Sequence, residues 1–300
     1  QVIHVSLPLG PDSHQAAAVH KFGEELERLT DGRLTIQSHY NNELGGEREV
    51  LEGMGINVID AGIISTAPMG GFVEEFLLFD LPFLFDDREH AYRVLDGEVG
   101  QELAEKLEEA ANVVVLGWAE DGFNQYSSSV APIEKPEDLE GIKLRVKENP
   151  LNVDTWNALG ANATPIAWPE VYTSLQQGVV DGQENPLPTI YDAKFYEVQD
   201  YVSITNHTFT PAPLMMSKQL FDSFSEEDQE AILEAGKLSQ PAGREASEQL
   251  DEETKGLLED EGVEINEPDV EPFREALKSV YDEWVPQIGE DLVEKVEQAK

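Results

Sequence analysis

One arginine stands in a pattern suited to binding an anion. Residues 142–146 (IKLRV) alternate apolar and charged side chains, the two-residue period of a half-buried strand, and Arg145 lies within it. A guanidinium presents a rigid fork of donors that matches a carboxylate through two parallel hydrogen bonds. The chain has only 20 Lys and Arg residues against 61 Asp and Glu. Arg145 is therefore a candidate carboxylate ligand, and the alternative is an arginine paired with one of the protein's own acids.

The elements around Arg145 alternate between strand and helix. After the strand at 142–146, Asn149-Pro150 predicts a helix start, and Gly160 predicts its end. Residues 163–166 predict a second strand, which Pro165 confines to an edge or a strand end. Pro169 predicts a further helix, and Asp181-Gly182 predicts a turn after Val179-Val180. Such alternation with short connections indicates a parallel-type α/β layer.

The rest of the chain has the same character. A strand at 59–64 ends in Ser65-Thr66, and ligands in open α/β sheets gather beyond the carboxyl ends of strands. Ser13 predicts a helix cap, and residues 91–107 predict one long helix. Ser225 predicts the start of a helix reaching to about residue 258, which Pro241 should kink or split. Other strands are expected near 3–7, 34–38, 113–118 and 201–210, other helices near 51–54 and 270–296.

Several linked motifs resemble one known family. They are ELGGERE (43–49), FVEEFLLFDLPFLFDDREHA (72–91), LRV (144–146), GANATP (160–165), PEVYTSLQQGVVDGQENP (169–186) and ITNH (204–207). Together they resemble the substrate-binding proteins of TRAP (tripartite ATP-independent periplasmic) transporters, the DctP-like family. The resemblance implies a periplasmic-binding-protein-like α/β fold with two lobes, hinge strands, an interlobe cleft and a long lobe-spanning helix. We expect residues 1–123 and 212–250 in lobe I, and residues 124–211 and 251–300 in lobe II, with the crossings near 121–128 and 206–214.

The resemblance also assigns roles to residues. It places Arg145 where the family clamps the ligand's carboxylate, and Asn185 where an asparagine hydrogen-bonds the same carboxylate. Asn185 precedes Pro186, so a turn residue is its alternative. Trp168 falls where an aromatic ring lies against the ligand's body, with ordinary core packing as its alternative. Ser65 and Thr66 are candidate contacts for a hydroxyl or headgroup.

Two further positions are candidates with a qualification. Glu184 is a site residue that we expect to face an internal partner rather than the ligand. Asn124 stands where many relatives place a second arginine. A neutral amide can hydrogen-bond a carboxylate or a hydroxyl but cannot neutralise charge. We therefore expect a one-arginine site that suits a monocarboxylate or hydroxylated acid better than a dianion.

Composition and charge limit the function classes. The formal net charge of −41 is spread over the chain, which disfavours nucleic-acid binding. Periodic apolar segments argue against disorder. Repulsion among the excess negative charges is screened in concentrated salt, where the screening length falls to about 3 Å near 1 M. We therefore expect a halophile's protein whose stability rises with salt. Without cysteine, disulfides and thiol catalysis are excluded.

These observations predict a receptor, not an enzyme. It would bind a small organic acid, a monocarboxylate or sugar acid among the candidates, and deliver it to the integral-membrane subunits of a TRAP-type permease. We expect an extracytoplasmic monomer, in the periplasm or at the outer face of the cell membrane, that does not itself span a membrane, with a signal or anchor segment outside this sequence. No cofactor or metal is expected. The alternatives are a sugar- or peptide-binding protein of an ATP-driven importer and a carboxylate-dependent hydrolase.

Overall fold

The chain packs into two units, and each is made of three segments that alternate along the sequence with those of the other. A computed structural model describes residues 1–300. Unit 1 comprises residues 1–66, 95–121 and 211–249, and unit 2 comprises residues 67–94, 122–210 and 250–300. Residues 67–94 thus pack in unit 2, whereas the sequence placed them in lobe I. The identity of these packing units with functional lobes stays a prediction.

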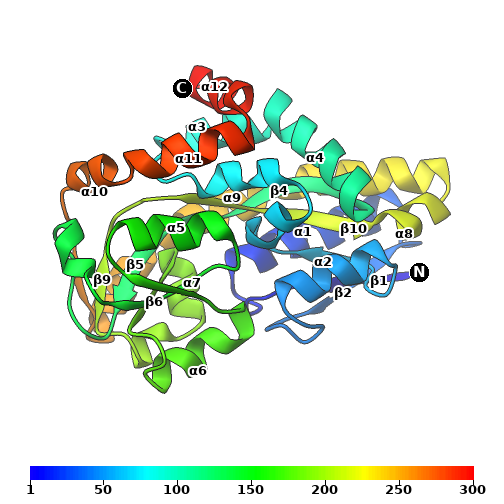
Figure 1. Ribbon diagram of the computed structural model, residues 1–300. Coiled ribbons are helices and arrows are strands. Elements are labelled where there is room, and N and C mark those ends of the chain that lie inside the picture. Colours follow the sequence, from blue (N-terminus) through cyan, green and yellow to red (C-terminus); the bar gives the residue numbers. More distant parts are fainter. The chain divides into compact units, whose positions relative to one another are not determined.

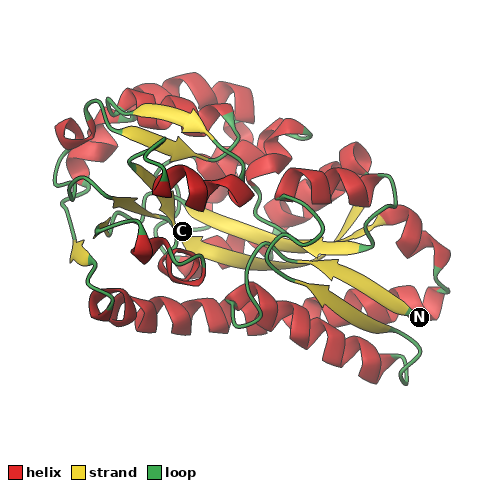
Figure 2. Cartoon of the chain, turned by 90° about the horizontal axis from the view of Figure 1, so that it is seen from below, coloured by secondary structure: helices red, strands yellow, loops and turns green.

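Unit 1 is built on a five-stranded sheet with the order β2-β1-β3-β10-β4. β1 pairs in parallel with β2 and with β3, and β10 pairs antiparallel to β3. Figure 2 shows the strands of this sheet lying side by side, with helices along them. Its elements are β1 (Val2–Ser6), α1 (His14–Leu29), β2 (Thr35–His39), α2 (Glu47–Gly55), β3 (Ala61–Ile63), α4 (Glu98–Ala111), β4 (Val113–Phe123, whose last two residues belong to unit 2), β10 (Phe209–Ser217, whose first two residues belong to unit 2) and α8 (Lys218–Ser223).

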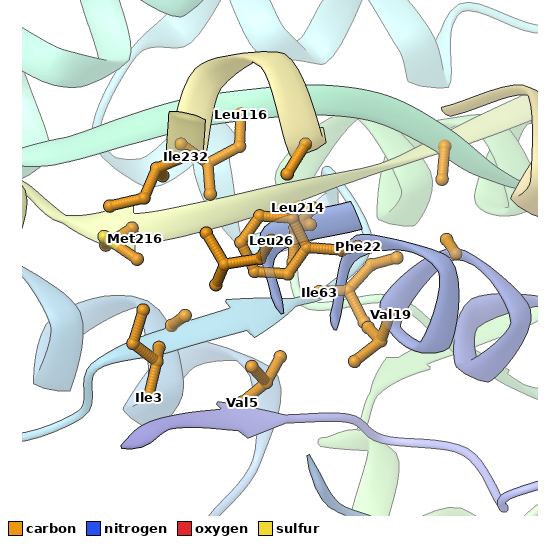
Figure 3. Packing of buried hydrophobic residues seen from close by; sticks show 14 of the residues in the cluster. Ile3, Val5, Val19, Phe22, Leu26, Ile63, Leu116, Leu214, Met216 and Ile232 are labelled. Carbon is orange, nitrogen blue, oxygen red and sulfur yellow. The ribbon is translucent and has the colours of Figure 1, made fainter. Parts of the chain in front are cut away.

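The core of unit 1 lies between this sheet and α1. The alternation of β1 turns Ile3 and Val5 inward, and both are fully buried. Phe22 and Leu26, one helical turn apart on α1, meet Leu214 of β10, as Figure 3 shows. A helix face and a strand face therefore bury each other, which is the main source of stability for this layer.

The long helix α9 (Glu226–Asp260) belongs to unit 1 up to residue 249 and to unit 2 from residue 250. Within unit 1 it lies very close to β4. A Cβ on Gly117 would lie 2.6 Å from the carbonyl oxygen of Gly236, and a Cβ on Gly236 would overlap the carbonyl oxygen of Leu116. Only glycine allows this approach of two backbones. The helix continues through Pro241, so of the two predicted effects of this proline the split does not occur, while a kink stays a prediction.

Unit 2 is built on a six-stranded sheet with the order β11-β9-β5-β8-β6-β7. β6 pairs in parallel with β7 and β8, whereas β5 pairs antiparallel to β8 and β9. Figure 1 shows α5 (green) beside β6. The elements are α3 (Arg88–Leu95, whose last residue belongs to unit 1), β5 (Gln125–Ser128), β6 (Lys143–Val146), α5 (Pro150–Ala158), β7 (Asn162–Pro165), α6 (Val171–Gln176), β8 (Gly182–Asn185), α7 (Leu187–Asp192), β9 (Tyr201–Ser203), β11 (Glu264–Asn266), α10 (Glu271–Ala276), α11 (Lys278–Ile288) and α12 (Glu290–Gln298).

Local signals placed most of these elements correctly. Asn149 caps α5 by accepting a hydrogen bond from the backbone N–H of Asn152 at 2.7 Å, and Gly160 follows the helix at φ +91°. Ser13 caps α1 in the same way. β7, which ends at Pro165, is the edge strand, as the proline predicted.

Three local predictions were wrong. Residues 91–107 form two helices, because Gly97 takes an extended backbone as the N-cap of α4. The segment 270–296 forms three helices, with the last break at Gly289, where φ is +119°. Gly182 begins β8 instead of ending a turn. A Cβ there would overlap the carbonyl oxygen of Ser127 on β5, so close strand packing explains this glycine.

Candidate functional site

Arg145 is held inside unit 2 by β6. Its strand neighbours Leu144 and Val146 are fully buried, and Arg145 itself is 4% exposed. Its Nε donates a hydrogen bond to the carbonyl oxygen of Ile166 at 2.9 Å. Its guanidinium carbon lies 5.9 Å from the centre of the Trp168 ring. These contacts fix the plane of the guanidinium, as recognition of a carboxylate requires.

Trp168 packs against the core, which is one of the two roles that the sequence left open, and its contact with a ligand stays a prediction. It begins the 3-10 helix η4 (Trp168–Glu170) and is half-buried. Its ring lies 5.5 Å from the ring of Phe195, within the apolar cluster around α6 and α7. The ring thus packs on the core and also adjoins Arg145. This arrangement supplies an apolar wall beside a cation.

Asn185 ends β8, the strand next to β6. It is 7% exposed, and its Nδ2 donates to Gln183 Oε1 at 2.6 Å. It is paired with Gln125 of β5, so it is a strand residue and not an isolated turn residue. Because β8 lies between β5 and β6, sheet pairing brings Asn185 close to the strand that carries Arg145.

Glu184 faces internal partners, and the expectation that it does not contact the ligand stays a prediction. It is fully buried, with Oε1 3.5 Å from Lys147 Nζ and Oε2 3.4 Å from His207 Nε2. Burial alone would raise the pKa of Glu184, but the Lys147 ammonium, the neighbouring His207 ring and the Arg145 guanidinium outweigh it and lower the pKa below its ordinary value. Glu184 is therefore an internal anion beside the candidate ligand residues.

Asn124 is also fully buried, and its amide donors are used inside unit 2. Its Nδ2 donates to Thr210 Oγ1 at 2.7 Å and to Thr208 Oγ1 at 2.9 Å. Its backbone N–H donates to the carbonyl oxygen of Thr208 at 2.8 Å. A role for Asn124 in ligand contact stays a prediction.

Ser65 and Thr66 follow β3 and belong to unit 1. Both Ser65 Oγ and the Ser65 backbone N–H donate to the carboxylate of Glu47, at 3.0 and 2.7 Å. The Thr66 backbone N–H donates to the carbonyl oxygen of Pro211 at 3.1 Å. Both side chains are nearly buried. The other five candidates belong to unit 2.

Four residues of this region were not singled out from the sequence: Asp80, Lys147, His207 and Thr210. They are all at most 6% exposed. Lys147 could have been found from its spacing, because it follows Arg145 by two residues and so shares its side of an extended chain. The other three lie 60 or more residues from Lys147 in the sequence. Only the fold brings them to Lys147.

Asp80 adds a second buried carboxylate. Its Oδ1 and Oδ2 accept hydrogen bonds from Asn152 Nδ2 at 2.7 Å and Asn149 Nδ2 at 2.9 Å. Burial raises the pKa of Asp80 to about 6, against the opposing effect of Lys147. The interior thus holds two carboxylates beside Arg145, Lys147 and His207.

This chemistry suits binding of an anion more than coordination of a metal. No group of three or more His, Asp or Glu side chains is placed to hold a metal ion. None of the helices is both long and apolar enough to cross a membrane. A buried guanidinium beside an aromatic ring, in an α/β fold, suits the binding of a small anionic solute.

The comparisons with known proteins agree. Residues 6–287 match the family described as DctP, bacterial extracellular solute-binding protein, family 7, and the chain belongs to that family. A solute-binding protein of Verminephrobacter eiseniae is 36% identical over 299 residues, covering 99% of this chain and 89% of the relative.

Solved structures show the same fold. A TRAP periplasmic solute-binding protein from Polaromonas, bound to D-erythronate, has 35% identity and a TM-score of 0.96, and the match covers 99% of this chain and 98% of the other. The sugar acid-binding protein DctPAm of Advenella mimigardefordensis, in complex with galactonate, has 35% identity and a TM-score of 0.96, with 100% and 97% covered. The predicted fold class, a two-lobed periplasmic-binding-protein fold, is confirmed by these matches.

Proposed function

We propose that this protein is an extracytoplasmic receptor that binds a small organic acid and delivers it to a TRAP-type membrane permease. The observation that carries the proposal is Arg145, a buried and geometrically fixed guanidinium in a member of a solute-binding family. Arg145 would hold the ligand's carboxylate, Asn185 would hydrogen-bond it, and Trp168 would cover the ligand's body. The receptor would act in the periplasm or at the outer face of the cell membrane.

The ligand class can be narrowed to hydroxylated monocarboxylates. Two similar proteins bind D-erythronate and galactonate, each of which has a single carboxylate and several hydroxyls. Asn124 brings no charge to the position where the resemblance expects a second arginine. A second carboxylate would then enter the site without a matching cation, and burying an unpaired charge is costly. A location of the ligand between two lobes stays a prediction from the sequence.

A thermal-shift panel tests the ligand class. Erythronate, galactonate and glucuronate, compared with succinate and malate, would be added to the protein in about 1 M salt. A ligand that binds only the folded state raises stability by RT ln(1 + [L]/Kd), so a true ligand raises the melting temperature with concentration. We expect the sugar acids to act and the dicarboxylates to have little effect. Equal or stronger shifts by succinate and malate would contradict the one-arginine site.

A receptor also leaves its ligand chemically unchanged. Incubating the protein with a ligand from the panel, followed by mass spectrometry of the small molecule, distinguishes the receptor from the hydrolase. We expect full recovery of the ligand. We also infer adaptation to concentrated salt, supported by the formal net charge of −41.

A further inference from the structure

Lys147 is a buried cation with two polar partners. It follows β6 directly and is 6% exposed. Its Nζ donates a hydrogen bond to Thr210 Oγ1 at 3.0 Å and lies 3.5 Å from Glu184 Oε1. A lysine is almost never this buried unless it is paired. Its ammonium is therefore committed to the interior of unit 2.

Glu184 depends on this cation. Neither of its carboxylate oxygens accepts a hydrogen bond, although the residue is fully buried. Its negative charge therefore depends on the neighbouring Lys147 ammonium and His207 ring, which lie 3.5 and 3.4 Å from its two oxygens. The charged and titratable groups that act on it are Lys147, His207 and Arg145, and it acts in turn on Asp80. Lys147 has the largest of the favourable electrostatic effects.

Thr210 connects Lys147 to a second candidate residue. Its Oγ1 accepts hydrogen bonds from both Lys147 Nζ, at 3.0 Å, and Asn124 Nδ2, at 2.7 Å. Two donors occupy the two lone pairs of that hydroxyl. Lys147 therefore shares the Thr210 hydroxyl with Asn124 and also lies beside Glu184, which is adjacent in sequence to Asn185.

We propose that Lys147 is a positioning residue of the binding face, which neutralises Glu184 so that the residues around it can accept an anionic ligand. The expected effect of Lys147 on ligand binding rests on the proposed function. The electrostatic part, the pairing of Lys147 with Glu184, does not. Without Lys147, Glu184 either keeps a poorly compensated charge that repels the ligand's carboxylate or takes up a proton. Affinity and stability then both become dependent on pH.

The electrostatic part is tested without a ligand. Thermal unfolding between pH 5.5 and 8.5 would be compared for the wild type, Lys147→Met, Glu184→Gln and the double variant. Loss of Lys147 raises the pKa of Glu184 in the folded state, so the stability of Lys147→Met is retained at low pH and lost as pH rises. We expect its melting temperature, relative to the wild type, to fall toward pH 8.5, and the double variant to abolish that fall.

Two results would overturn the electrostatic part. One is the same pH dependence in Lys147→Met as in the wild type. The other is a double variant no more stable at pH 8.5 than Lys147→Met. If Lys147→Met does not fold, the double variant should still fold. If neither variant folds, the pairing of Lys147 with Glu184 is also rejected.

The effect on binding is measured by calorimetry with galactonate at pH 6 and pH 8. We expect Lys147→Met to bind at least tenfold more weakly than the wild type at pH 8, and to recover most of that loss at pH 6 as Glu184 takes up a proton. Lys147→Arg, which keeps the charge, should bind as the wild type does at both values. An equal loss at pH 6 and pH 8 would indicate a steric role and overturn the proposal. If the wild type binds no sugar acid, the proposed function fails, while the unfolding experiment still decides the pairing.

Discussion

Replacing Arg145 with alanine is the most direct test of the binding face. Arg145 is 4% exposed, so its charge acts on an anion with little screening by water. At an effective dielectric constant of about 20, two unit charges about 4 Å apart attract by about 4 kcal/mol. Truncating one partner of a buried charge pair costs roughly 2–5 kcal/mol. We therefore expect Arg145→Ala to raise Kd by roughly 30-fold to several-thousand-fold.

The assay is isothermal titration calorimetry with the most effective sugar acid of the panel. Arg145→Lys should give a smaller loss, because lysine keeps the charge but not the fork of donors. The matched control is Arg244→Ala, since Arg244 is also shielded but forms a two-bond pair with Asp96 in unit 1, at 2.7 Å for each bond. That control should lower stability and leave Kd unchanged. An unchanged Kd in Arg145→Ala would remove this residue from the site and refute the argument from burial and charge.

Three further predictions concern stability. The melting temperature should rise from dilute buffer to molar KCl, because salt screens the net charge of −41, and an unchanged or lower value would reject adaptation to salt. Gly236→Ala should destabilise by about 1–3 kcal/mol in chemical denaturation, because its Cβ would overlap the backbone at Leu116, whereas Gly256→Ala, on the same helix with nothing within 4 Å, should stabilise by up to about 1 kcal/mol. Asp80, with its pKa raised to about 6, favours the folded state most at low pH, and this contribution is lost as pH rises from about 4 past 6. The deficit of Asp80→Asn relative to the wild type should therefore shrink by on the order of 3 kcal/mol between pH 4 and pH 7.5, and a constant deficit would contradict the raised pKa.

Much of the frame around Arg145 could be predicted from the sequence. The alternation at 142–146, the cap at Asn149 and the edge proline at 165 are local signals, set by side-chain period and by the backbone conformations that Asn and Pro allow. The motif resemblance added the fold class and the family, and the comparisons confirmed both. These predictions held because each depends on residues close together in the chain.

Predictions failed where a distant backbone decided the outcome. Gly182 was expected in a turn, but it is a strand residue because β5 approaches it too closely for a Cβ. Pro241 was expected to kink or split α9, and the helix is not split there. Propensity describes an isolated segment, whereas packing against a neighbouring element can outweigh it.

The sequence by itself determined that this chain has an arginine on a half-buried strand, an excess of acids and the pattern of a solute-binding family. Only the tertiary structure decided which charged groups lie near that arginine. Asp80, Lys147, Glu184 and His207 are far apart in the chain and meet because unit 2 folds their segments together. A charge is stabilised by whatever lies within a few ångströms of it, and that neighbourhood is set by which strands pair, not by residue spacing.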